Sequence, residues 1–140
     1  MDGFAAVRNA ANRLRDEIGA TDLTTAAYAV RDAAVRRKLI LRPLAADDPE
    51  LEGAHGLLAR KFRQVLFRSD LAPDQSAEVV AHEIGHFELH EGPEAGFYPR
   101  SIIDGGDPNQ RIETYGLKER REAQANAFAR EFILPRATAK

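Results

Sequence analysis

Residues 81–90 read AHEIGHFELH, which places His82, His86 and His90 four residues apart. In an α-helix, residues four apart project from one face, one above the other, so His82 and His86 can both reach a single cation. The spacing is HExxH, at which two imidazoles bind zinc and the intervening glutamate, here Glu83, is placed to activate a water molecule. We therefore predict a helix that carries a metal centre.

This helix is predicted to begin at Pro73, which suits a first helical turn, and to stop near Gly92 and Pro93. Gly85 lies in its interior, where glycine costs about 1 kcal/mol relative to alanine. Close approach of another backbone would explain that glycine. His90 is about 12 Å from His82 along the helix axis. It is therefore expected to support the ligands or line the pocket, and not to bind the ion itself.

A catalytic zinc needs a third protein ligand and one open position. Glu122 shares a predicted apolar helical stripe with Asn126, Ala129 and Ile133. A carboxylate in such a stripe is costly unless it is paired or bound to metal. We predict Glu122 as the third ligand and Asn126, one turn later, as the residue that orients a histidine from behind.

Two alternatives to this assignment stay open. Glu113 is a rival third ligand, and Glu122 can instead pair with an arginine such as Arg121. On the opposite face of the same helix, Gln124 and Glu131 are expected to point to water, as is Arg120.

The first part of the chain predicts two helices and a sheet. Apolar residues at helical spacing indicate a first helix that ends near Gly19. A second helix is predicted over residues 25–37, capped by Asp22 or Thr24. The run KLILRPL predicts a strand stopped by Pro43.

The middle and end of the chain complete the expected fold. Residues 54–70 predict two strands around a turn near Arg60 and Lys61, hence a small antiparallel sheet. His55, beside a glycine, is expected at a turn or on the surface. Residues 91–116 are rich in glycine and proline and predict a loop, followed by a final helix that Pro135 stops. We expect one α+β domain over residues 1–140, which can also be the N-terminal part of a longer protein.

Composition excludes several classes of function. The formal charge of −2 gives no general electrostatic case for nucleic acid, and we expect no DNA binding by Arg31, Arg36, Arg37 and Lys38. No cysteine is present, so a metal must be held by His, Asp or Glu. Without an apolar leader or a run of transmembrane length, a cytoplasmic protein is the default expectation.

Two motifs together resemble a known family. VVAHEIGHFELH at residues 79–90 and REAQANAFAREFILP at residues 121–135 are similar to the ImmA/IrrE family of small zinc metallopeptidases. The resemblance implies a zincin-like α+β fold, with His82, His86 and Glu122 as metal ligands and Glu83 as the catalytic acid/base. It also implies a protein substrate, since the family includes cytoplasmic peptidases that cleave transcriptional repressors.

The expected mechanism is metal-assisted peptide hydrolysis, with Zn²⁺ as the cofactor and Mn²⁺ or Fe²⁺ as alternatives. Glu83 is expected to take the proton of the water and pass it to the leaving amine. Oxyanion donors are sought among Tyr98, Arg100 and Tyr115. An extended substrate is expected to add a strand to the sheet edge near residues 55–67. The competing hypothesis is a zinc-stabilised module that binds a regulator or a toxin–antitoxin partner without cutting it.

Overall fold

The computed structural model describes residues 4–90, 97–98 and 108–134, with side chains for residues 4–90 and 118–134. The N-terminal helices are α1 (Ala5–Ile18) and α2 (Ala26–Arg37). Gly19, in the left-handed conformation with φ 69°, ends α1 as predicted. Thr25, not Asp22 or Thr24, caps α2, because its hydroxyl accepts the N–H of Tyr28 from the position just before the first helical residue.

The sheet contains β1 (Ile40–Leu44), β2 (Gly56–Ala59), β3 (Gln64–Arg68) and β4 (Phe97–Tyr98), in the order β1-β3-β2-β4. The strands β2 and β3 are antiparallel around a 3-10 turn, Arg60–Phe62, as the sequence predicts. The prediction of a wholly antiparallel sheet is wrong, because β1 pairs parallel to β3. Alternation of apolar residues identifies strands, but whether two strands pair parallel or antiparallel depends on the path of the chain that connects them.

Pro43 lies inside β1, opposite Phe67 of β3, instead of ending the strand as expected. An edge strand tolerates a proline because its outer side needs no ladder hydrogen bond.

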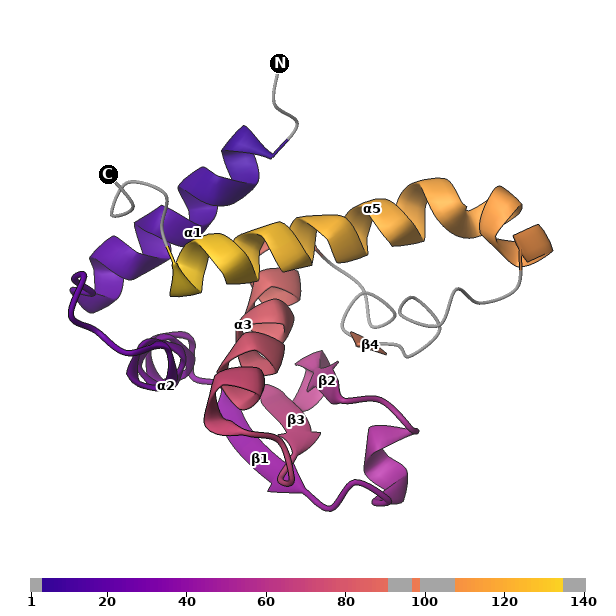
Figure 1. The fold of residues 1–140 in the computed structure, drawn as a ribbon, viewed down its shortest axis with the longest axis horizontal. Coiled ribbons are helices and arrows are strands. Elements are labelled where there is room, and N and C mark those ends of the chain that lie inside the picture. The colour runs from indigo at the N-terminus through magenta and orange to yellow at the C-terminus, as the bar shows by residue number, and fades with distance from the viewer. Residues whose placement is uncertain (1–3, 91–96, 99–107, 135–140) are drawn as a thin grey trace.

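The helix α3 (Pro73–Leu89) occupies the centre of the fold, with α5 crossing one side and the sheet on the other (Figure 1). Nine of its residues are buried: Ala77, Val79, Val80, Ala81, His82, Glu83, Ile84, Gly85 and His86. A helix buried all round needs neighbours on every side, and α2, α5, β2 and β3 supply them. The helix ends at Leu89, slightly before the predicted stop, so His90 is already extended, with φ −128° and ψ 152°.

The helix α5 (Pro108–Ile133) begins earlier than the predicted start near Gly116. Pro108 suits a first helical turn, and the glycine at 116 is tolerated within the helix. The predicted loop over residues 91–116 is therefore wrong for its last part, and Phe97–Tyr98 of that segment form β4. Among the residues that the structure describes, none of the helices has both the length and the hydrophobicity of a membrane-spanning segment.

The hydrophobic core lies where α1, α2, α3 and α5 meet. Its largest fully buried apolar side chains include Leu14, Ile84, Phe128 and Phe132. Arg15 of α1 is buried there, and its Nη1 donates to the carbonyl oxygen of Phe132 at 2.7 Å. This bond satisfies a carbonyl at the end of α5, where no helical partner remains.

Candidate metal centre

The helices α3 and α5 bring two histidines and one glutamate together. His82 Nε2 lies 2.9 Å from Glu122 Oε1, and His86 Nε2 lies 2.9 Å from Glu122 Oε2. The two Nε2 atoms are 3.2 Å apart. All three side chains are buried, with exposed fractions of 2%, 0% and 6% for His82, His86 and Glu122. The main contacts of the Glu122 carboxylate are therefore with the two histidines, and not with Arg121 as in the alternative.

The donor atoms of this cluster fit a divalent metal ion. Within the described residues, one donor atom from each of His82, His86 and Glu122 lies within 4.8 Å of the others. Ligands about 2.0 Å from a tetrahedral zinc are separated by about 3.3 Å. The observed separations of 2.9 Å to 3.2 Å are close to this value. The group can therefore hold a metal ion.

The hydrogen bond behind His82 favours the same interpretation. Asn126, one turn after Glu122 on α5, places Oδ1 2.7 Å from His82 Nδ1. An amide oxygen only accepts, so Nδ1 carries the proton and the Nε2 of a neutral ring presents a lone pair. That lone pair faces the carboxylate of Glu122, and two acceptors at this distance need a proton or a cation between them. This supporting position is the one predicted for Asn126 from the sequence.

His90 lies next to the cluster, although it is outside α3. Its Nδ1 is 2.9 Å from Nδ1 of His86, and its Nε2 is 2.8 Å from Oε1 of Gln124. Gln124 therefore does not point to water as expected. Glu131 is also buried, at 4% exposure, and accepts a hydrogen bond from Asn12 of α1. The periodicity of α5 alone does not reveal that α1 covers this face.

Glu83 follows His82 and is fully buried. Neither of its carboxylate oxygens has a well-formed hydrogen bond within the described residues. Burial raises the pKa of Glu83 well above its ordinary value, and the charge of Glu122 raises it further, while the backbone of Leu58 lowers it slightly. A buried, unpaired carboxyl is costly to keep in a fold, and such groups are concentrated at functional sites.

Burial also affects the pKa values of His86 and Glu122. It lowers the pKa of His86, an effect that outweighs the opposing attraction of Glu122. For Glu122, burial alone would raise the pKa, but the contacts with His82 and His86 outweigh it and lower the pKa. A neutral imidazole and an ionised carboxylate are the forms that bind a metal ion.

Gly85 allows α3 and α5 to approach closely. A Cβ atom at this position would lie 3.1 Å from Cδ1 and 3.2 Å from Cβ of Phe128. The prediction that another backbone approaches Gly85 is wrong, because the close neighbour is a side chain. The consequence for the site is the same, since Phe128 lies on the helix that carries Glu122.

The strand β2 packs against α3 next to Glu83. A Cβ atom at Gly56 would clash with Val79 Cγ1 and lie 3.7 Å from Cγ of Glu83. The outer edge of β2 pairs antiparallel with β4 at Gly56 and Leu57. Part of the edge expected to receive substrate is therefore paired within the chain.

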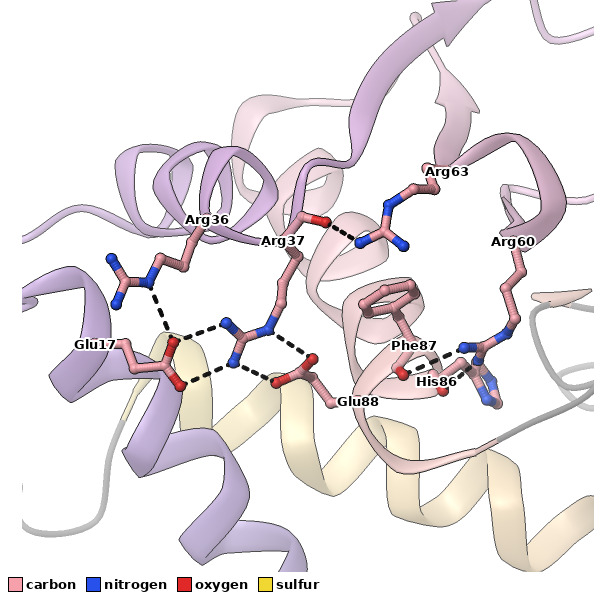
Figure 2. Close-up of polar contacts among 8 residues, drawn as sticks. All are labelled: Glu17, Arg36, Arg37, Arg60, Arg63, His86, Phe87 and Glu88. Atoms are coloured by element: carbon pink, nitrogen blue, oxygen red, sulfur yellow. Dashed lines mark hydrogen bonds and ion pairs between the residues drawn. The ribbon is translucent and has the colours of Figure 1, made fainter.

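Arginines hold the C-terminal end of α3, as Figure 2 shows. Arg60 donates to the carbonyl oxygens of His86, Phe87 and His90, and its guanidinium lies 5.1 Å from the centre of the Phe87 ring. Arg37 of α2 binds Glu88 at 2.9 Å and Glu17 at 2.7 Å. The sequence predicts only a turn at Arg60, because the carbonyl groups that Arg60 contacts lie far along the chain.

The remaining candidates lie apart from the cluster or outside the described side chains. His55 contacts Arg68, with 3.2 Å between Nδ1 and Nη1. Glu113 belongs to α5, but its side chain is outside the described residues, as are those of Tyr98 and Tyr115; Arg100 lies outside them entirely. Glu122 is thus the carboxylate that the described structure brings to the histidines.

Comparison with known proteins identifies one family. The family model of Peptidase M78, described as the IrrE N-terminal-like domain, matches residues 38–140. The match includes the sheet, α3 and α5. No curated protein and no solved structure matches the chain significantly.

Proposed function

The chain belongs to the Peptidase M78 family, and we propose that it is a zinc-dependent endopeptidase that hydrolyses a peptide bond in a protein partner. Its family supports a function of the metallopeptidase type. The specific proposal depends on one observation, the convergence of His82, His86 and Glu122 at the face shared by α3 and α5.

In this proposal, His82, His86 and Glu122 hold the metal ion. A bound divalent ion would polarise the scissile carbonyl and lower the pKa of a water molecule. Two imidazoles and a carboxylate suit zinc, and they also suit Mn²⁺ and Fe²⁺. Metal analysis of the purified protein distinguishes these ions.

Glu83 is proposed as the acid/base. It takes a proton from the attacking water and delivers it to the leaving nitrogen of the peptide. Its burial and raised pKa support this role, because a carboxyl that exchanges a proton in both directions works best with a pKa near the working pH. Asn126, behind His82, is proposed to keep that ring in the orientation needed for binding.

The proposed substrate is an extended segment of a regulatory protein. The antiparallel pairing of β4 with β2 supports strand addition, because β2 offers the main-chain groups of this edge for hydrogen bonding. A substrate that pairs at Gly56 and Leu57 has to displace β4. By the resemblance to the ImmA/IrrE family, we propose a transcriptional repressor or related regulator in the cytoplasm as the target, cut by a single domain over residues 1–140.

Metal content tests the proposal first. We expect about one zinc per purified chain, a loss of zinc in Glu122→Ala, and no loss in Glu113→Ala. Retention of zinc by Glu122→Ala together with loss in Glu113→Ala would assign the third ligand to Glu113.

Peptide hydrolysis is tested with a peptide library from a bacterial proteome, analysed by mass spectrometry. The wild type is expected to generate new peptide ends that Glu83→Gln, loaded with the same metal, does not. Cleavage by neither protein, with intact metal binding, would favour the non-catalytic binding module.

A further inference from the structure

His86 has two ring nitrogens, and the structure gives each a different neighbour. Nε2 faces Glu122 in the ligand cluster, whereas Nδ1 lies 2.9 Å from Nδ1 of His90. A short contact between two imidazole nitrogens requires one of them to donate a proton and the other to accept it. The ring that donates is not decided by this contact alone.

Gln124 decides it. Its Oε1 lies 2.8 Å from Nε2 of His90, and an amide oxygen only accepts hydrogen bonds. The proton of a neutral His90 is therefore on Nε2, which leaves Nδ1 of His90 as the acceptor. The proton in the contact between the two histidines then belongs to Nδ1 of His86.

This chain of hydrogen bonds has a consequence for the ligand cluster. With Nδ1 protonated, neutral His86 presents a lone pair at Nε2, which lies 2.9 Å from the carboxylate of Glu122 and 3.2 Å from Nε2 of His82. Asn126 has the same effect on His82 through its Nδ1. One helix, α5, thus carries a candidate ligand and both of the amides that direct the two imidazoles.

The backbone of His90 is held independently of its ring. His90 is the residue that caps the C-terminus of α3, and its backbone is extended. Arg60 donates to the carbonyl oxygens of both His90 and His86, and the N–H of His90 donates to the carbonyl oxygen of His86 at 2.9 Å. These bonds fix the backbone of His90, and the contacts of its ring with His86 and Gln124 place the ring between them.

We propose that Gln124 is a positioning residue of the metal centre: through His90, it fixes the tautomer of His86 whose Nε2 is free to bind the ion. The inference rests on the proposed function in that His86 is taken as a metal ligand. Outer hydrogen-bond partners of metal-bound histidines generally fix the ring orientation and the tautomer. A Gln124–His90 pair that only closed the end of α3 would not determine which nitrogen of His86 carries the proton.

The tautomer is measured directly by long-range ¹H–¹⁵N NMR of the histidine rings in the metal-free wild-type protein. We expect His86 to be protonated at Nδ1 and His90 at Nε2. A His86 ring without a proton on Nδ1 would overturn the proposal. This measurement needs neither metal nor activity, so it stands if the proposed peptidase function fails.

Zinc affinity provides the second readout. Gln124→Leu removes the acceptor and is expected to give His86 mixed tautomers and about 10- to 100-fold weaker zinc binding in a competition titration with a chelator. Gln124→Glu keeps an acceptor oxygen and is expected to restore binding to near the wild-type level. Arg120→Leu, at an exposed position of the same helix, is the control for the change to leucine and is expected to bind zinc as the wild type does.

Two results would overturn the proposal at this stage. One is wild-type zinc affinity in Gln124→Leu. The other is equally weak binding in Gln124→Glu and Gln124→Leu while both variants keep the wild-type circular dichroism spectrum and melting temperature. Absence of zinc binding by the wild type would contradict the proposed function, whereas the ring tautomers would still be read from the metal-free protein.

Discussion

Gly85 of α3 faces Phe128 of α5, and a Cβ atom at Gly85 would lie 3.1 Å to 3.2 Å from three atoms of the Phe128 side chain. One of these atoms is Cβ of Phe128, which moves only with the backbone of α5. The separation of the two helices at the metal centre is therefore coupled to the absence of a side chain at Gly85.

Gly85→Ala is expected to weaken zinc binding, because it pushes Phe128 and with it Glu122 away from the histidines. Alanine gains about 1 kcal/mol in helix propensity over glycine, which offsets part of the packing strain. The measurement is zinc affinity beside the melting temperature of the metal-free protein. A variant that is more stable and binds zinc as tightly as the wild type would show that α5 adjusts without moving Glu122.

Arg60→Met is expected to destabilise the fold by about 1–3 kcal/mol, because it leaves carbonyls at the end of α3 without a charged donor. It should also weaken zinc binding, since Arg60 holds the backbone of His86 and His90. Arg63→Met is a matched control, because Arg63 lies 5.2 Å from the same Phe87 ring but donates to the carbonyl oxygens of Arg37 and Lys38. Equal loss of zinc affinity in both variants would assign the effect to packing on Phe87.

Glu83→Gln is expected to raise the melting temperature of the metal-free protein while it abolishes hydrolysis. The wild-type carboxyl is buried without a well-formed partner, so folding must bury its charge or protonate it, and the neutral amide removes that cost. Melting curves and zinc content are measured together. A lower melting temperature in Glu83→Gln would indicate that the carboxylate stabilises the fold through a contact of its own.

Glu17→Gln is expected to lower the free energy of unfolding near neutral pH but to have little effect in strong acid. Hydrogen bonds from Arg37 and Arg36 lower the pKa of Glu17 to about 2 in the folded state. A lowered pKa stabilises the fold above the unfolded-state pKa, near about 4.3, and this contribution disappears as the pH falls toward the folded-state value. Urea unfolding at several pH values should therefore give the wild type the larger free energy of unfolding at pH 6. Near pH 2 the two proteins should have similar values.

High salt supplies a check on this interpretation. Because Glu17 is on the surface, salt should also reduce the difference between the two proteins. A difference that is independent of pH would contradict the assignment to the Glu17–Arg37 pair.

Local patterns predicted much of the candidate site. The four-residue spacing of His82 and His86 places both on one helix face whatever the rest of the chain does. The carboxylate of Glu122 in an apolar stripe indicated a buried partner, and the structure brings it to these histidines. Both inferences depend only on helix geometry and on the cost of burying a charge.

Features that depend on distant parts of the chain were not predictable in this way. Glu131 is buried because Asn12 and its helix cover it, and the parallel pairing of β1 with β3 depends on the path through β2. Gln124 was expected to face water because the periodicity of α5 carries no information about His90. That residue follows α3, and its ring contacts Gln124 of α5. Tertiary contact decides each of these cases.

Anomalous diffraction at the zinc edge from crystals of the zinc-loaded protein would locate the metal ion and its ligands. We expect one strong peak bound by His82 Nε2, His86 Nε2 and a carboxylate oxygen of Glu122. A peak that the two histidines share with Glu113, or one located away from this pair, would contradict it.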